Sequence, residues 1–273
     1  MLPTTIATRW LSPATNESKP TMSVFRNVVF IAAISGLLAG VILAALQTYS
    51  TDPLIFKAET YENAGGHDHG AAPVAGTEAT APAADAQAVA PAEEEAWAPA
   101  DGFERFAYSA LANIVSGIAF GLILVAVSEF AGGIANWRQG VFWGFAGFAV
   151  FTLAPGLGLP PELPAMPAAD LVSRQIWWTL TVVATAAGLA LIAFKQSLPL
   201  AVLGVALIVA PHIVGAPQPE SHESPIPADL HHSFVVAVTI SNLVFWVVLG
   251  AVAGYVRNRF MSEPAQSLNG RLA

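Results

Sequence analysis

Six long apolar runs, separated by polar segments, constrain the fold of this chain more than any other feature. A helix that crosses a bilayer needs about 20 apolar residues, because the hydrocarbon core is about 30 Å thick and each residue rises about 1.5 Å. The first, second, fourth and sixth runs meet that length, and the third and fifth are shorter. The sequence therefore predicts an all-α polytopic membrane bundle of six transmembrane helices, with five as the alternative. The runs are residues 24–47, 106–127, 139–156, 176–194, 198–214 and 233–256.

The composition supports a membrane protein and excludes several kinds of chemistry. Only 11% of the residues are charged, whereas soluble domains carry about 25%. The absence of cysteine excludes disulfides and thiolate metal sites. The sequence contains neither a nucleotide-binding P-loop nor an H-E-x-x-H zinc motif, and no basic surface suggests nucleic acid. We therefore expect no enzyme and no bound cofactor.

The placement of charge predicts an orientation, because cytoplasmic loops of membrane proteins carry an excess of Lys and Arg. With six spans and an internal N-terminus, eight of the 11 Lys and Arg residues fall on the inner side. Sixteen of the 19 Asp and Glu residues, and all six histidines, then fall outside or at the outer membrane edge. We expect a multi-pass inner (cytoplasmic) membrane protein with both termini in the cytoplasm. The inner basic residues are Arg9, Lys19, Arg26, Arg138, Lys195, Arg257, Arg259 and Arg271.

Polar segments divide the chain into a membrane domain and two tails. Residues 1–23 and 261–273 are expected to be tails, the first of them disordered, and residues 24–260 the membrane domain. Residues 63–100 interrupt that domain with a segment built mainly of Ala, Pro, Glu and Gly. Such a composition cannot bury enough apolar surface to offset the entropy of ordering, so we expect a flexible external loop.

Glycines four residues apart recur in the apolar runs. At this spacing two glycines lie on one face of a helix, where they let a neighbouring backbone approach closely. We interpret these pairs as packing contacts between helices and assign them no ligand. The pairs are Gly36 and Gly40, Gly117 and Gly121, Gly140 and Gly144, and Gly250 and Gly254.

The external loop begins with a first candidate metal site, His67-Asp68-His69. Two imidazoles and a carboxylate can capture a divalent transition metal. A flexible loop holds such ligands loosely, because nothing orients them in advance. The stretch is therefore either a metal-capturing arm or a solvated polar turn.

A second group of histidines flanks the last two apolar runs. His212 follows the fifth run at the outer membrane edge, where a titratable group is costly unless it is satisfied. His222 lies in a segment that prolines keep extended, and His231 and His232 begin the last helix. Adjacent helical residues point about 100° apart, so these two cannot easily chelate one ion together. The group is either a metal-binding mouth or a set of interfacial histidines. The prolines are Pro211, Pro217, Pro219, Pro225 and Pro227.

Polar residues near or within the membrane provide further candidates. Glu59 and Glu62 follow the first run and, three residues apart, share a helical face. They are either oxygen ligands or surface charge, and for the pair alone surface charge is the favoured interpretation. Asn113 and Asn242 lie within apolar runs, where they either hydrogen-bond between helices or line an ion path.

A resemblance to a known family rests on five stretches: "SGLLAGVILAALQTYSTDPLIFKAETYE", "AWAPADGFERFAYSALANI", "GVFWGFAGFAVFTLAPGLGLPPELPAMPAADLVSRQIWWTLTVVATAAGLALIAF", "PHIVGAPQPE" and "ADLHHSFVVAVTISNLVFW". Together they resemble the CbtA family of predicted cobalt transporters, from about Phe25 to Phe260. The resemblance implies five spans and cobalt uptake associated with cobalamin metabolism. It also implies a small, single-span, histidine-bearing partner subunit, CbtB. Cobalt comes from the resemblance, because imidazole and carboxylate ligands alone do not distinguish Co²⁺ from Ni²⁺ or Zn²⁺.

These observations combine into one functional hypothesis. We expect a transporter subunit that captures Co²⁺, its substrate, with the external loop and passes it to a more ordered outer site made by His212, His222, His231 and Glu59. The alternative is a membrane component that does not transport and instead senses metal or acts as an assembly scaffold for a partner. The candidate ligands are His67, Asp68, His69, His212, His222, His231, His232, Glu59 and Glu62.

Overall fold

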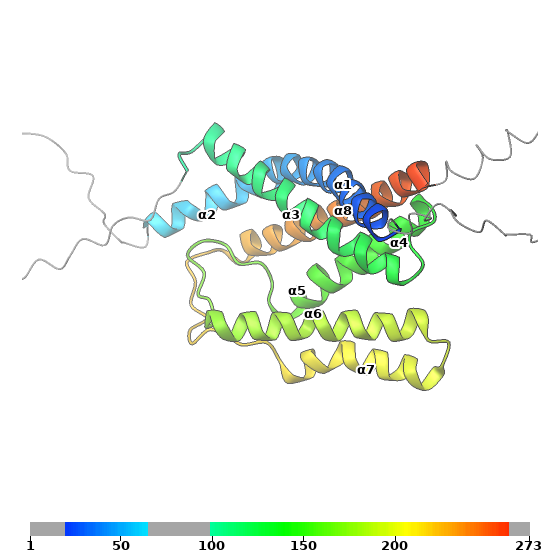
Figure 1. Ribbon diagram of the computed structural model, residues 1–273. Helices are drawn as coiled ribbons and strands as arrows, with labels where there is room; N and C mark the ends of the chain where they lie inside the picture. The colour runs from blue at the N-terminus through cyan, green and yellow to red at the C-terminus, as the bar shows by residue number, and fades with distance from the viewer. Residues whose placement is uncertain (1–19, 65–98, 262–273) are drawn as a thin grey trace, which may run out of the picture.

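The computed structural model describes residues 20–64 and 99–261, and the regular elements in these ranges are all helices (Figure 1). The predicted all-α fold is therefore confirmed for the described residues. Both predicted tails, apart from their residues nearest the bundle, and most of the predicted loop 63–100 lie outside these ranges. The elements are α1 Pro20–Ser50, α2 Asp52–Ala64, α3 Phe103–Phe130, α4 Trp137–Phe148, the π-helix η1 Ala149–Leu153, α5 Ala154–Gly158, α6 Leu171–Phe194, α7 Leu198–Val214 and α8 Ala228–Met261.

Five helical segments of the described chain are long and apolar enough to cross a membrane. The third apolar run, expected to be short, extends to 22 residues because α4, η1 and α5 follow one another without a break. The fifth run forms the shorter α7, whose 17 residues span about 26 Å. A short turn connects α6 to α7, and the two helices lie side by side in opposite directions (Figure 1). The five spans are Val24–Ser50, Phe103–Phe130, Trp137–Gly158, Leu171–Phe194 and Ala228–Phe260.

The outward surfaces of these helices are apolar. Large hydrophobic side chains such as Leu38, Val41, Leu180, Val183 and Val202 are exposed along the middle of the spans. A continuous apolar surface of this extent is unfavourable in water and suits contact with lipid. The chain is therefore a multi-pass membrane protein.

Both described chain ends lie at one end of the bundle. The rings of Phe30 on α1 and Phe260 on α8 are 5.2 Å apart, centroid to centroid. We call this the basic end, because the described helix ends and turns there carry Arg26, Arg138, Lys195, Arg257 and Arg259. The opposite end, which we call the acidic end, contains α2 and the segments 99–102, 159–170 and 215–227 (Figure 1).

Close backbone contacts at glycine join α1 to α3 and α4 to α8. A Cβ atom on Gly117 would lie 2.5 Å from the carbonyl oxygen of Gly36. Gly140 and Gly250 face each other in the same way, and a Cβ on either would overlap the carbonyl oxygen of the other. The predicted packing role of these glycines is confirmed. The four helices share one apolar core, which includes Ile31, Leu43, Leu124, Val125, Phe148, Trp246 and Leu249.

The helices α6 and α7 form a hairpin that packs as a separate pair. Their contact is again close at glycine, because a Cβ on Gly188 would lie 2.5 Å from the carbonyl oxygen of Gly204. These two glycines lie on different helices, so a spacing of four residues within one helix does not indicate their contact. The hairpin meets the other described helices mainly through η1 and α5.

A charged cluster closes the basic end of the core. The guanidinium of Arg257 on α8 donates to both carboxylate oxygens of Glu129 on α3, at 2.7 and 3.1 Å, and to the carbonyl oxygen of Ile134 at 3.0 Å. The turn between α3 and α4 fits around this side chain at Gly133, whose φ of 79° favours glycine. One arginine therefore ties together α3, α8 and the connection to α4.

At the acidic end, α2 lies across the start of α8. Ala58 of α2 is fully buried in a second apolar cluster with Leu163, Ile226, Leu230 and Phe234. The cluster joins α2 and α8 to the segments 159–170 and 215–227, neither of which is helical. These long connections are therefore anchored at their middle positions.

We expect the substitution Gly140→Val to destabilise the bundle by at least about 1–3 kcal/mol, the usual cost of overpacking. The added side chain meets the backbone of Gly250, which cannot rotate away as a flexible side chain would. Thermal unfolding of the purified protein in detergent would measure the effect. The matched control is Gly156→Ala, because a Cβ at Gly156 meets no atom within 4 Å. Equal melting temperatures for the two variants would contradict the close contact.

Candidate functional site

The two candidate carboxylates on α2 have different surroundings. Glu59 is half-buried and accepts two hydrogen bonds from the guanidinium of Arg105 on α3, at 2.5 and 3.4 Å. Glu62 is exposed. Because Arg105 already neutralises Glu59, this carboxylate joins α2 to α3 rather than facing the histidines. Glu62 keeps the environment of a surface charge.

A third carboxylate, Asp52, was not predicted and lies beside the same arginine. It lines a small cavity of about 260 Å³ together with Arg105, Phe56 and Ser109. Burial raises the pKa of Asp52 above its ordinary value, and the charge of Arg105 partly offsets that effect. No sequence pattern indicates this site, because only the tertiary fold places the start of α3 beside Asp52.

His212 belongs to the contact between α6 and α7. Its ring packs edge-on against the buried indole of Trp177, with centroids 5.8 Å apart. The Trp177 Nε1 in turn donates to the carbonyl oxygen of Pro211 at 3.2 Å. Pro211 lies inside the last turn of α7, so the prediction that it belongs to the extended segment was wrong. The half-buried His212 thus packs within the hairpin.

The other described histidines lie at the acidic end. His222 is exposed in the segment 215–227, which is non-helical as its remaining prolines predicted. His231 and His232 both fall in the first turn of α8, and they diverge as expected for adjacent residues. His231 Nε2 lies 3.0 Å from the carbonyl oxygen of Pro161, and His232 is exposed. Among the described histidines, His222 and His232 are therefore the most accessible to an ion in solution.

The structure does not bring the predicted outer site together. Within residues 20–64 and 99–261, no three His, Asp or Glu side chains lie close enough to hold a metal ion. The other predicted group, His67, Asp68 and His69, lies outside the described residues. The ligand roles of all nine candidate residues stay predictions.

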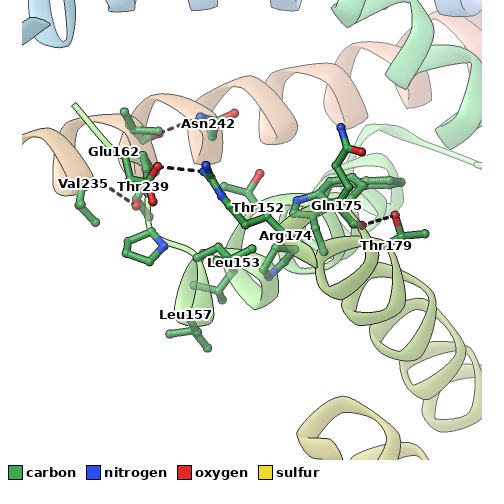
Figure 2. A pocket seen from close by; sticks show the side chains of 18 of the residues that line it. Thr152, Leu153, Leu157, Glu162, Arg174, Gln175, Thr179, Val235, Thr239 and Asn242 are labelled. Carbon is green, nitrogen blue, oxygen red and sulfur yellow. Dashed lines mark hydrogen bonds and ion pairs between the residues drawn. The ribbon is translucent and has the colours of Figure 1, made fainter. Parts of the chain in front are cut away.

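A large cavity with a mainly apolar lining and one ion pair lies between the hairpin and α8. Its volume is about 860 Å³, and it is walled by η1, α5, the segment 159–162, the start of α6 and the first half of α8. Glu162 and Arg174 are the charged residues among those that line it, and they form an ion pair of 3.0 Å. Figure 2 shows the side chain of Arg174 reaching from α6 towards Glu162, with Thr239 and Asn242 of α8 beside the pair.

Several polar side chains of the cavity use their hydrogen-bond donors on their own helix. Thr179 Oγ1 donates to Gln175 O at 2.8 Å, and Thr239 Oγ1 donates to Val235 O at 2.7 Å. Asn242 Nδ2 donates to Val238 O at 2.9 Å. The remaining lone pairs of these oxygens are acceptors, and they lie among lining residues that are mainly apolar. Asn242 therefore lines a cavity, whereas the other candidate, Asn113, hydrogen-bonds to Gln47 at 2.6 Å and joins α3 to α1.

The π-helix η1 shapes one wall of this cavity. It comes just before Pro155, which has no N–H and whose ring would clash with the carbonyl group four residues earlier in a regular α-helix. The wider turn accommodates the proline and places Thr152 in the wall, where its Oγ1 accepts from Trp246 Nε1 at 3.3 Å. Such π-turns are frequent at functional sites.

A bundle of long apolar helices with charged residues sorted to its two ends defines the class of this chain, a polytopic membrane protein. More specifically, the chain belongs to the CbtA family, described as probable cobalt transporter subunits, whose family model matches residues 25–258. The match confirms the resemblance seen in the sequence, and membership of a transporter subunit family suggests a role other than catalysis. A search of the curated proteins and a search of the solved structures found no match.

We expect Glu59→Ala to loosen α2 from α3, because Arg105 loses its partner on α2. A partly exposed ion pair contributes up to about 1 kcal/mol, so local opening of α2 should increase by no more than about fivefold. The rate of limited trypsin cleavage after Lys57 would measure this opening. Glu62→Ala is the matched control, since Glu62 is exposed on the same helix. Identical cleavage rates for the two variants would contradict an anchoring role for Glu59.

Proposed function

We propose that this chain is the membrane subunit of a system that takes up Co²⁺, associated with cobalamin metabolism. The observation that carries the proposal is the family match over residues 25–258, which covers nearly the whole length of the helical spans. The fold supports it, because a multi-pass bundle is the architecture that a transport path requires. The proposed location is the inner membrane, with the acidic end outside and the basic end in the cytoplasm, following the excess of Lys and Arg in cytoplasmic loops.

In this proposal the metal ligands come from more than one part of the assembly. His222 and His232 are exposed at the acidic end, but they do not form a three-ligand group within the described residues. We assign the missing ligands to His67, Asp68 and His69 of the first loop and to a histidine-bearing partner subunit of the CbtB kind. The word subunit in the family description supports the need for a partner.

The direct test is uptake of radiolabelled Co²⁺ by proteoliposomes that contain the full chain, with and without the partner. We expect accumulation above that of empty liposomes. The double variant His67→Ala/His69→Ala should raise the half-saturating Co²⁺ concentration roughly tenfold, a loss of about 1.4 kcal/mol, with an unchanged maximal rate. This pattern is expected because the loop captures the ion before the transport step.

The matched control for this variant removes residues 79–84, an uncharged stretch of the same loop. The shortened loop should transport like the unaltered chain. If no Co²⁺ accumulates under any condition, the transporter hypothesis fails, and a metal-sensing or scaffold component becomes the better description.

A second prediction concerns external pH. Neutral imidazole is the form that binds a metal, so uptake should fall as the external pH drops below about 6.5, the ordinary pKa of histidine. Initial rates measured between about pH 7.5 and 5.5 would show the decrease. The His67→Ala/His69→Ala variant should show a weaker pH dependence. A flat profile for the unaltered chain would contradict histidine ligation.

A further inference from the structure

The cavity between the hairpin and α8 has the size and lining of a compartment for a hydrated cation. Each water molecule takes about 30 Å³ in the liquid, so an ion with six waters occupies roughly 200 Å³. The cavity of about 860 Å³ therefore admits the ion without removing its water shell. A hydrated ion needs acceptors for its water protons rather than a tight set of direct ligands.

Oxygen acceptors on the wall offer contacts for a positive charge. Three polar side chains of the wall each donate one hydrogen bond to a carbonyl oxygen of their own helix, and their side-chain oxygens keep lone pairs that can accept. These residues are Thr179, Thr239 and Asn242. Glu162 adds a carboxylate. Donors also line the cavity on Gln175 and Trp178, and Arg174 contacts Glu162 through one guanidinium nitrogen at 3.0 Å. The carboxylate of Glu162 is therefore the feature of the wall that distinguishes a cation from an anion.

The position of Arg174 suggests why this compartment does not hold a cation permanently. Arg174 lies in the first turn of α6, and its side chain extends into the cavity to reach Glu162 on the opposite wall (Figure 2). The guanidinium occupies the place where an external cation would be attracted most strongly. Both side chains keep about a quarter of their surface exposed, 29% for Arg174 and 26% for Glu162, so the pair can separate without unpacking the core.

We propose that this cavity is the vestibule for a hydrated divalent cation, and that Arg174 is a tethered cation which the ion displaces from Glu162. The proposal rests on the proposed uptake function and deepens it, because it names the compartment that the ion occupies after leaving the surface. The depth of the cavity suits this role. Asn242 lies 14 residues into α8, about 21 Å along the helix from its start at the acidic end.

The absence of cysteine allows a test that does not depend on transport. In the full chain reconstituted in lipid nanodiscs, Thr239→Cys places one thiol in the cavity wall, and Thr179→Cys places one on the facing helix. The rates of reaction with a cationic and an anionic methanethiosulfonate reagent would be measured at each thiol. Gln218→Cys, in the segment 215–227 at the acidic end, is the matched control outside the cavity.

We expect the cationic reagent to be favoured at the cavity thiols, relative to the control thiol. Glu162→Gln should lower the ratio of cationic to anionic rates at these thiols, and Arg174→Gln should raise it. Each of the two rates should change by roughly 2- to 30-fold, in opposite directions for the two reagents, which is the range that one unit charge about 8 Å away produces for effective dielectric constants of about 80 to 20. The ratio at the control thiol should not change.

Ion occupancy is tested in the same variants with Mg²⁺, because a thiol would bind Co²⁺ directly whereas Mg²⁺ prefers oxygen and keeps its water shell. The double variant Thr239→Cys/Arg174→Gln is compared with Thr239→Cys alone. Millimolar Mg²⁺ should lower the rate at which the cationic reagent modifies the thiol of the double variant. The decrease should be smaller in the variant that retains Arg174. The vestibule proposal would be contradicted if the substitutions of Glu162 and Arg174 left the reaction rates unchanged. It would also be contradicted if the cavity thiols reacted with neither reagent. If the thiol reaction rates change as expected but proteoliposomes take up no Co²⁺, the proposed uptake function is rejected. The proposal that the cavity admits a hydrated cation is then retained.

Discussion

Backbone contact at glycine is the interaction on which the rest of this bundle depends. Inside a bilayer the hydrophobic effect does not drive helices together, because lipid tails are as apolar as leucine side chains. Association then requires dense packing, and Gly117 against Gly36 and Gly140 against Gly250 allow backbones to meet without side chains between them. The same close packing places Arg257 beside Glu129 and the carbonyl oxygen of Ile134, which lie far away in the sequence.

The same constraint explains where the polar cavity lies. The glycine contacts join α1 to α3, α4 to α8 and α6 to α7, but within the described chain no such contact joins α6 to α8. Pro155 and the π-turn before it prevent a regular helix at this position. The segments η1 and α5 remain the main link between the α6–α7 hairpin and the other described helices. A space therefore remains between the hairpin and α8. The residues that line this space take no part in the glycine contacts between helices.

Features that depend on the local sequence could be predicted, and features that depend on chain packing could not. The apolar runs predicted the positions of the described helices except α2, which lies outside every run, and the glycine pairs within one helix were recognised as contacts. The pairing of Glu59 with Arg105, 46 residues later, required knowledge that the start of α3 lies beside α2. In the same way, neither the contact of His231 with Pro161 nor the ion pair of Glu162 with Arg174 has a sequence signature, because each joins segments that only the tertiary fold brings together. The predicted histidine cluster thus divides between α7, an extended segment and α8.

The separate packing of the α6–α7 hairpin has a mechanical consequence. One wall of the cavity belongs to this hairpin, and the opposite wall belongs to α8, which is fixed in the core. The width of the space between the two walls is therefore set by the angle at which the hairpin meets η1 and α5, and no glycine contact among the described residues fixes it directly.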